Sequence, residues 1–268
     1  MTSENRITAL GRGGSDLTAV ALSVGLNQDM CEIYTDVDGV LTGDPRLIPS
    51  ARKISQLEFS EMMEMAALGS QVLQPRSVEL GAKHQIKIHV RHSLKKGEGT
   101  WIMNLEDKME KSVVSAIAHD PNTIVIRISN IPEEEGFLAH LFSQLGEESI
   151  SVDIISKTET VQGPSLAFSI NHEDVQPALK ALKKFVNEKQ ILVVKNVAKI
   201  SIIGVGMAHH SGVAGRFFSV FHKLSVPLHL ITTSEIKISA IIDKKHLKKT
   251  ANQLHKEFEL TQNESPKQ

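Results

Sequence analysis

The chain has 268 residues, which suits about two domains or three small ones, and its 41% hydrophobic and 23% charged content is typical of globular proteins. A formal net charge of −1 excludes a broad basic surface for nucleic acid or membranes, and the single cysteine excludes an internal disulfide and favours a reducing compartment. No stretch approaches about 18 consecutive apolar residues and the N-terminus lacks the pattern of a signal peptide, so we expect no membrane association and a cytoplasmic location.

The first predicted elements are a glycine-rich loop and a helix. The loop reads Gly-Arg-Gly-Gly-Ser-Asp over residues 11–16, and apolar residues then recur at helical spacing up to Val24. Adjacent glycines let backbone N–H groups approach an anion closely, and the N-terminus of the following helix adds a partial positive charge. The segment is therefore either an anion-binding loop or a flexible turn before a helix.

A short strand over residues 31–35 follows and ends in the polar loop Thr35–Arg46. The loop lies at the carboxyl end of the strand, where open α/β sheets bind their ligands. Asp36 or Asp38 could orient a ribose, an adenine amine or a Mg²⁺-bound water, and Arg46 could meet phosphate oxygens. A ligand-free Asx-turn loop is the alternative.

Two short helices over 61–68 and 76–80 and an alternating strand over 86–90 come next. Strand and helix alternate, so the first hundred or so residues are predicted to be α/β with a largely parallel sheet. The polar stretch 95–111 is the best candidate for a linker. The twelve histidines show no metal-ligand spacing with cysteine or acidic residues, so we expect no metal site.

An internal repeat fills the rest of the chain. Each copy is predicted to contain strand, glycine-containing loop, helix and strand, then a further strand and helix, which is the βαββαβ order of a ferredoxin-like unit. These predicted elements include the strand Val152–Ile155 of the first copy and the helix Val213–Leu224 of the second. The strand Val113–Ala118 precedes the first copy and is a candidate for completing the sheet of the second. Matching positions stand 76 residues apart: Ile124 and Ile200, Ile126 and Ile202, Gly136 and Gly212, Phe142 and Phe218, Ile155 and Ile231.

Together these motifs resemble the aspartate kinase branch of the amino-acid kinase family. The resemblance continues through residues 61–65, 73–79, 99–102 and 233–239 and covers about residues 5–260. It implies an α/β fold: the C-terminal part of a three-layer, carbamate-kinase-like domain followed by two ferredoxin-like ACT domains. It also implies N-terminal incompleteness, because the family's opening segment, with a lysine before Phe-Gly-Gly, is not found. The expected divisions are 1–110 for the kinase part, 111–195 and 196–262 for the ACT domains, and 263–268 for a tail.

The resemblance implies that the chain is an aspartate kinase, a phosphotransferase with a carboxyl acceptor. Such enzymes transfer the γ-phosphoryl group of ATP, used with Mg²⁺, to the side chain of L-aspartate. The product is 4-phospho-L-aspartate, in the first step of lysine, threonine and methionine biosynthesis. Because the acceptor carboxylate is ionised at neutral pH, the reaction needs positioning and charge neutralisation rather than a strong general base.

Residue roles also follow from the resemblance. Arg12, Gly13 and Gly14 would bind the aspartate, and Ser15 and Asp16 would organise phosphoryl transfer. Leu41 stands where a tyrosine is usual, and Gln71 stands where a lysine is usual, which removes a charge from the nucleotide site. The expected nucleotide contacts are Thr35, Asp36, Leu41, Thr42, Gly43, Asp44, Pro45, Arg46 and Gln71.

The ACT pair of the family binds amino-acid effectors between copies from two subunits. The resemblance thus implies a homodimer or heteromer formed through these domains, with lysine, threonine or both as effectors. Asp153 would meet the ligand ammonium, and Lys157 would repel a lysine side chain if it faced the pocket. The matching effector positions are Glu135, Gly136, Asp153, Lys157, His210, Gly212, Thr233 and Glu235.

Two alternatives remain open. The ACT pair could dimerise without sensing an amino acid. The whole chain could also be a non-catalytic regulatory subunit or fragment that associates with a complete kinase, a reading favoured by the missing opening segment, Leu41 and Gln71.

Overall fold

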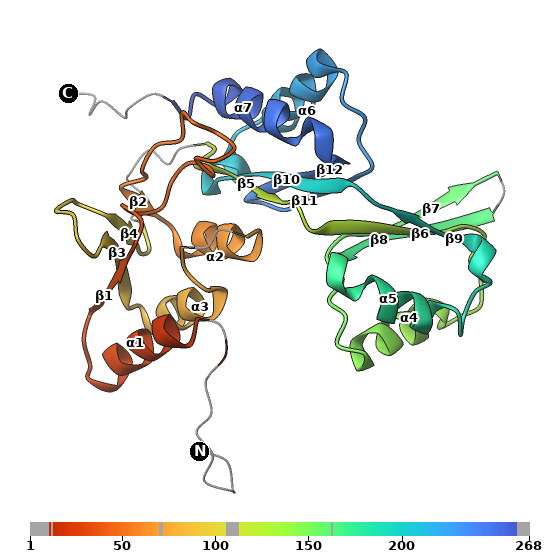
Figure 1. Cartoon of the computed structure of the whole chain (residues 1–268), viewed down its shortest axis with the longest axis horizontal. Coiled ribbons are helices and arrows are strands. Elements are labelled where there is room, and N and C mark those ends of the chain that lie inside the picture. The colour runs from red at the N-terminus through yellow and green to blue at the C-terminus, as the bar shows by residue number, and fades with distance from the viewer. Residues whose placement is uncertain (1–10, 12, 70–71, 106–112, 162, 262–268) are drawn as a thin grey trace, which may run out of the picture.

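The computed structural model describes residues 11, 13–69, 72–105, 113–161 and 163–261. In these ranges the strands form three four-stranded sheets. The first sheet has the order β1-β3-β4-β2, the second β11-β12-β10-β5 and the third β7-β8-β6-β9. Figure 1 shows the first sheet at one end of the molecule, with the second and third following one another toward the other end. No helix in these described ranges is long and apolar enough to cross a membrane.

The first sheet contains β1 (Met30–Thr35), β2 (Gln56–Leu57), β3 (Lys87–His92) and β4 (Thr100–Ile102). The β1–β3 and β2–β4 pairs are parallel and the β3–β4 pair is antiparallel, so the sheet is mixed rather than purely parallel. Three helices accompany it: α1 (Gly14–Gly25), α2 (Phe59–Ala67) and α3 (Pro75–His84).

Local sequence explains the ends of α2 and α3. The Glu61 side chain accepts a hydrogen bond from the backbone N–H of Glu58 at 3.1 Å, which completes a capping box at the start of α2. Pro75 occupies the first turn of α3, where its missing N–H costs nothing. The helix ends at His84 because Gln85 adopts a left-handed conformation with φ 58°.

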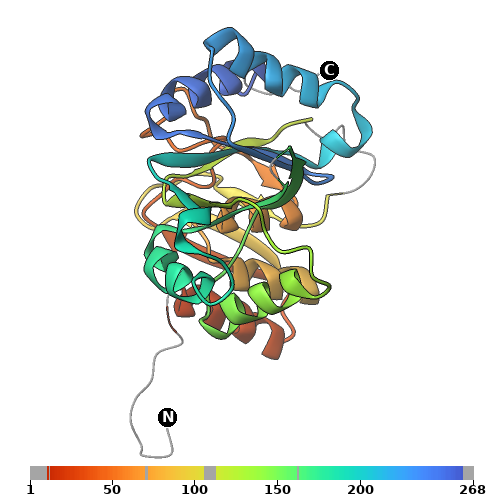
Figure 2. The same ribbon diagram turned by 90° about the vertical axis from the view of Figure 1, so that its right-hand side faces the viewer.

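The two repeat copies form the ferredoxin-like units that the 76-residue repeat predicts. The first copy has β6 (Thr123–Ile128), α4 (Phe137–Glu147), β7 (Ile155–Thr160), β8 (Gly163–Asn171), α5 (Val175–Leu182) and β9 (Ile191–Val194). The second copy has β10 (Val197–Ile203), α6 (Val213–Leu224), β11 (Leu230–Thr233), β12 (Lys237–Asp243) and α7 (Leu247–Glu257). Figures 1 and 2 show α4 and α5 on the opposite side of the sheets from α6 and α7.

One predicted strand begins later than its sequence indicates. The predicted strand Val152–Ile155 becomes β7, which starts at Ile155. Asp153 donates its N–H to the carbonyl of Ser169 at 3.1 Å, and Ile154 donates its N–H to Ser169 Oγ at 3.0 Å. Two residues therefore oppose one, as in a β-bulge, which ends regular pairing before Ile155.

The second repeat unit packs tightly against the first sheet. Strand β5 (Ala116–Asp120) pairs antiparallel with β10 and forms an edge of the second sheet. Its residues Ala116 and Ala118, with Ile203, complete the buried core around α2 and α3. In the other direction, Ile48 from the loop after β1 is 1% exposed and belongs to the core of the second unit. The loop after β1 therefore packs against both the first sheet and the second repeat unit.

Candidate functional site

The glycine-rich loop forms the N-terminus of α1. Gly13 caps the helix with φ 72°, a left-handed conformation that favours glycine. A Cβ at Gly13 would lie 1.8 Å from Cγ of Gln74, so the loop lies directly against the residue that precedes α3. Ser15 donates its hydroxyl to Asp16 Oδ1 at 3.3 Å. Arg12, the predicted aspartate ligand, lies outside the described residues.

A cavity of about 420 Å³ lies beside the end of β1. The loop after β1 supplies most of its wall, and α2 with the residues that follow it and strand β5 supply the rest. Seven of the nine residues expected to contact a nucleotide line this cavity: Thr35, Asp36, Leu41, Gly43, Asp44, Pro45 and Arg46. Gly13, Gly14, Ser15 and Asp16 do not belong to its lining, and Gln71 lies outside the described residues.

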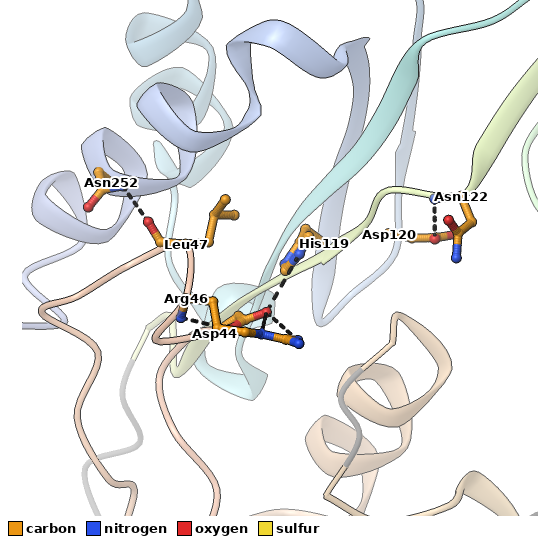
Figure 3. Close-up of polar contacts among 7 residues, drawn as sticks. All are labelled: Asp44, Arg46, Leu47, His119, Asp120, Asn122 and Asn252. Carbon is orange, nitrogen blue, oxygen red and sulfur yellow. Dashed lines mark hydrogen bonds and ion pairs between the residues drawn. The ribbon is translucent and has the colours of Figure 1, made fainter.

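Asp44 and Arg46 form the most strongly charged part of the cavity wall (Figure 3). Asp44 Oδ1 accepts the backbone N–H of Arg46 at 2.9 Å, and Oδ2 accepts the Nη2 group of Arg46 at 2.8 Å. These bonds lower the pKa of Asp44 and raise the pKa of Arg46. The Asp44 side chain is mostly buried, whereas the Arg46 side chain is 77% exposed, so Asp44 anchors a cation that remains open to a ligand.

His119 of β5 lies beside Asp44 at this wall (Figure 3). Its Nε2 atom lies 3.9 Å from Asp44 Oδ2. Burial lowers the pKa of His119, with Asp44 acting in the opposite direction, so the imidazole is neutral at pH 7. The sequence analysis missed this residue, because nothing in the local pattern of β5 indicates that the strand lies beside a loop about 75 residues earlier.

Thr42, also expected to contact the nucleotide, is turned away from the cavity. Its side chain is 4% exposed, and its Oγ1 atom lies 2.8 Å from Nε2 of His255 on α7. The same oxygen accepts the backbone N–H of Arg52 at 3.0 Å. Other lining residues that the sequence analysis did not select are mostly apolar: Val37, Gly39, Met65, Gly69, Val72, Ile117 and Ala118.

The predicted effector positions fall into separate places. Gly136, which caps α4 with φ 87°, and Lys157 line a shallow cavity of about 280 Å³ at the start of that helix. Lys157 Nζ lies 3.3 Å from Glu159 Oε1, so this lysine has a carboxylate partner in its own strand. Glu135 is exposed in the loop just before Gly136.

The other effector positions lie away from that cavity or already have partners. Asp153, the residue expected to bind the ammonium group of the effector, forms an ion pair with the ammonium group of Lys199 on β10 instead. His210 Nδ1 lies 2.8 Å from the carbonyl oxygen of Gly206, and Gly212 caps α6 with φ 86°. Thr233 ends β11, and both it and Glu235 are exposed.

In the described ranges, no group of three or more His, Cys, Asp or Glu side chains is placed to hold a metal ion. The carboxylates near the cavity are instead engaged in local hydrogen bonds and ion pairs. Asp36 accepts the hydroxyl of Thr35 at 3.1 Å, and Asp38 lies 3.3 Å from Lys95 Nζ.

Comparisons with known proteins find family matches for two segments of the chain. Residues 1–92 match the amino acid kinase family, and residues 200–258 match the ACT domain. An aspartokinase of Pseudomonas aeruginosa is 40% identical over 260 residues, which is 95% of this chain and 63% of that protein. The chain thus spans less than two thirds of this relative's length.

Solved structures agree with these matches. Escherichia coli aspartokinase III in complex with aspartate and ADP has a TM-score of 0.82 and 26% identity, and the match covers 95% of this chain and 58% of that one. The same enzyme in complex with lysine and aspartate has a TM-score of 0.75. The ligand-free regulatory subunit of aspartate kinase from Thermus thermophilus has a TM-score of 0.51 and 29% identity, and the match covers 55% of this chain and 99% of that subunit.

The chain therefore has one segment that matches the amino acid kinase family and one that matches the ACT domain, and over nearly its whole length it is similar to aspartokinases.

Proposed function

We propose that the chain acts as an aspartate kinase polypeptide, which uses ATP to phosphorylate the side-chain carboxylate of L-aspartate and is controlled by an amino acid at its ACT domains. The observation that carries the proposal is the cavity whose wall includes Asp44 and Arg46, where Asp44 anchors the exposed side chain of Arg46. The similarity to aspartokinases over 95% of the chain supports it.

The wall of the cavity suits a nucleotide for three reasons. Leu41, Met65, Val72 and Ile117 provide apolar surface that a base can cover. The Arg46 guanidinium is a planar, always charged donor that matches phosphate oxygens. Neutral His119 can donate or accept a hydrogen bond without adding charge.

The phosphoryl acceptor would approach from the glycine-rich loop. Aspartate needs no strong base because its carboxylate is already ionised at neutral pH. Backbone N–H groups at the start of α1 and the partial positive charge of that helix would stabilise negative charge on the transferred group. The described residues thus supply positioning and part of the charge neutralisation that phosphoryl transfer requires.

Magnesium would enter with the nucleotide. Mg²⁺ in kinase sites is usually held by one or two carboxylates, by water and by the substrate phosphates. Asp36 lines the cavity and fits this limited role, since its carboxylate accepts a hydrogen bond from the hydroxyl of Thr35. The ion would neutralise charge on the phosphates.

An ATP-dependent aspartyl hydroxamate assay, combined with calorimetric titration of ATP, tests the proposal. Arg46→Ala is expected to weaken ATP binding about tenfold or more, because it removes a charged hydrogen-bond donor. Arg91→Ala is the matched control: Arg91 also pairs with a carboxylate, Glu32 at 3.0 Å, but does not line the cavity. A chain that neither binds ATP nor forms the hydroxamate, alone or with a partner polypeptide, would refute the proposal.

A second candidate function is that of a non-catalytic regulatory subunit that associates with a complete kinase. The likeness to the Thermus thermophilus regulatory subunit favours it, because almost all of that subunit matches. Calorimetric titration with lysine, threonine and methionine, together with the hydroxamate assay, separates the two candidates. Amino-acid binding without ATP binding supports the regulatory subunit, whereas ATP binding that depends on Arg46 supports the kinase.

The ACT domains are proposed to bind the effector at the start of α4, near Gly136 and Lys157. Left-handed Gly136 exposes backbone N–H groups of the first helical turn, which can receive a carboxylate. Assembly as a homodimer or heteromer through these domains is part of the same proposal. Gly136→Val should reduce amino-acid binding in calorimetry without changing ATP affinity.

A further inference from the structure

The loop with the cavity residues is built into the second ACT unit. After Arg46 the chain continues through Leu47 and Ile48, and Ile48 is 1% exposed within the core cluster that includes Phe217, Leu254 and Phe258. Leu47 and Ala51 pack against the same cluster. The loop is therefore held by the packing of α6 and α7 as well as by its own sheet.

Polar contacts attach this loop to α7 at several points. His255, whose side chain is fully buried, lies with Nε2 2.8 Å from Thr42 Oγ1 and with Nδ1 3.4 Å from Ser50 Oγ. Asn252 donates its side-chain amide to the carbonyl of Leu47 at 2.8 Å (Figure 3). His255 and Asn252 lie one turn apart or less on α7, so one helix holds the loop at three places.

Strand β5 holds the same loop from the cavity side. Ile117 donates its N–H to the carbonyl of Thr42 at 2.8 Å, and His119 lies beside Asp44. Thr42 and Leu47 thus bracket Asp44 and Arg46 in the chain, and both are bonded to the second ACT unit. The position of the Arg46 guanidinium over the cavity depends on these attachments, because the Arg46 side chain is exposed and is held by Asp44.

We propose that α7 of the second ACT unit is a structural part of the nucleotide site, with His255 and Asn252 as positioning residues for the loop Thr42–Arg52. They touch no nucleotide; they hold Asp44 and Arg46 in place relative to the cavity. The inference rests on the proposed nucleotide site. It predicts that a change in α7 alters nucleotide binding and leaves aspartate binding unchanged.

Substitutions on α7 test this inference in the full chain. Asn252→Ala removes one hydrogen bond to the loop and should weaken ATP affinity about fivefold. Gln253→Ala is the control, because Gln253 is the partly exposed neighbour on the same helix and, among the residues that the structure describes, forms no hydrogen bond with the loop. His255→Gln keeps a polar group near Thr42 and should retain more ATP affinity than His255→Leu, which removes both contacts.

The KM values for ATP and for aspartate distinguish a positioning role from partial unfolding. A positioning role raises the KM for ATP and leaves the KM for aspartate unchanged, whereas partial unfolding lowers the active fraction without changing either constant. Hydrogen–deuterium exchange supplies an arm that needs no nucleotide. Amides of the loop that bond within it, such as Thr42 to Arg52 at 2.8 Å and Ile48 to Asp44 at 2.8 Å, should exchange faster in Asn252→Ala than in Gln253→Ala.

The outcomes decide between the two proposals. Equal loop exchange and equal ATP affinity in Asn252→Ala, Gln253→Ala and the wild type would overturn the positioning role. If the wild type binds no ATP, the proposed nucleotide site fails, and faster exchange in Asn252→Ala would then show attachment of the loop without a nucleotide role. Faster exchange with a selective loss of ATP affinity supports the inference.

Discussion

At the scale of single residues, His255 is a buried titratable group with a strongly shifted pKa. Its side chain is fully buried among Thr42, Ser50 and the helix that carries it. Burial, assisted by the positive charge of Arg52, lowers the pKa of His255 from 6.5 to about 4. The ring is thus neutral at pH 7 and can both donate and accept hydrogen bonds.

This neutral histidine makes the free energy of unfolding depend on pH. The unfolded chain binds a proton near pH 6.5, whereas the folded chain does so only near pH 4. Stability is therefore complete above pH 6.5 and decreases as the pH falls through this window, by at most about 3 kcal/mol. Urea unfolding at about pH 7.5 and about pH 5 should show a smaller decrease for His255→Gln. An equal decrease would contradict the assignment.

Gly99 occupies a position where backbone conformation and close neighbours leave no room for a side chain. It has φ 68°, and a Cβ there would lie 2.2 Å from the carbonyl oxygen of Val90. Gly99→Ala should lower the free energy of unfolding by at least about 2 kcal/mol in urea, because it combines left-handed strain with overpacking. Gly97→Ala, where a Cβ meets nothing within 4 Å, should be close to neutral.

At the scale of elements, α2 connects the first sheet to the second ACT unit. Glu61 is 2% exposed, and its Oε1 accepts the hydroxyl of Ser115 at 2.6 Å and the backbone N–H of Val205 at 3.0 Å. One turn later, Glu64 pairs with Lys237 of β12 at 2.7 Å. The helix also supplies Met65 to the cavity wall.

The buried carboxylate of Glu61 should be important for this docking. Glu61→Gln replaces one acceptor oxygen by an amide donor, which then faces a backbone N–H, so we expect a loss of about 1–3 kcal/mol of unfolding free energy. Glu79→Gln, on an exposed position of α3, is the matched control and should change stability little. Equal stability of the two variants by urea unfolding would show that Glu61 contributes nothing to the docking.

At the scale of the whole molecule, the first sheet leaves β1 as an edge strand with apolar side chains beside it. Edge strands with exposed apolar surface pair readily with other chains. Leu22, Leu26, Met30 and Tyr34 of α1 and β1 and their connection are each at least 41% exposed.

We therefore expect concentration-dependent association of the chain with a second copy through this edge. Light scattering over a range of concentrations should show it, and the double substitution Met30→Lys with Tyr34→Lys should reduce it. Leu94→Lys changes a still more exposed apolar residue outside β1 and should leave association unchanged. A monodisperse monomer in the wild type would overturn this expectation.

Sequence by itself determined the features that depend on local pattern. The 76-residue repeat predicts two ferredoxin-like units because each copy repeats the same strand and helix periodicities. The helix Val213–Leu224 has the predicted bounds. The polar loop after β1 was identified as a ligand site candidate because its acidic and basic residues follow a strand directly, and seven of its predicted contacts line one cavity.

Only the tertiary structure decided which distant residues complete that cavity and which ones hold its loop in place. His119 lies about 75 residues from Asp44, and His255 lies 213 residues from Thr42, so no local periodicity connects them. Packing likewise turned Thr42 away from the cavity and paired Asp153 with Lys199. Such contacts depend on how the faces of sheets and helices fit together, and a linear pattern encodes which face is apolar but not which partner will cover it.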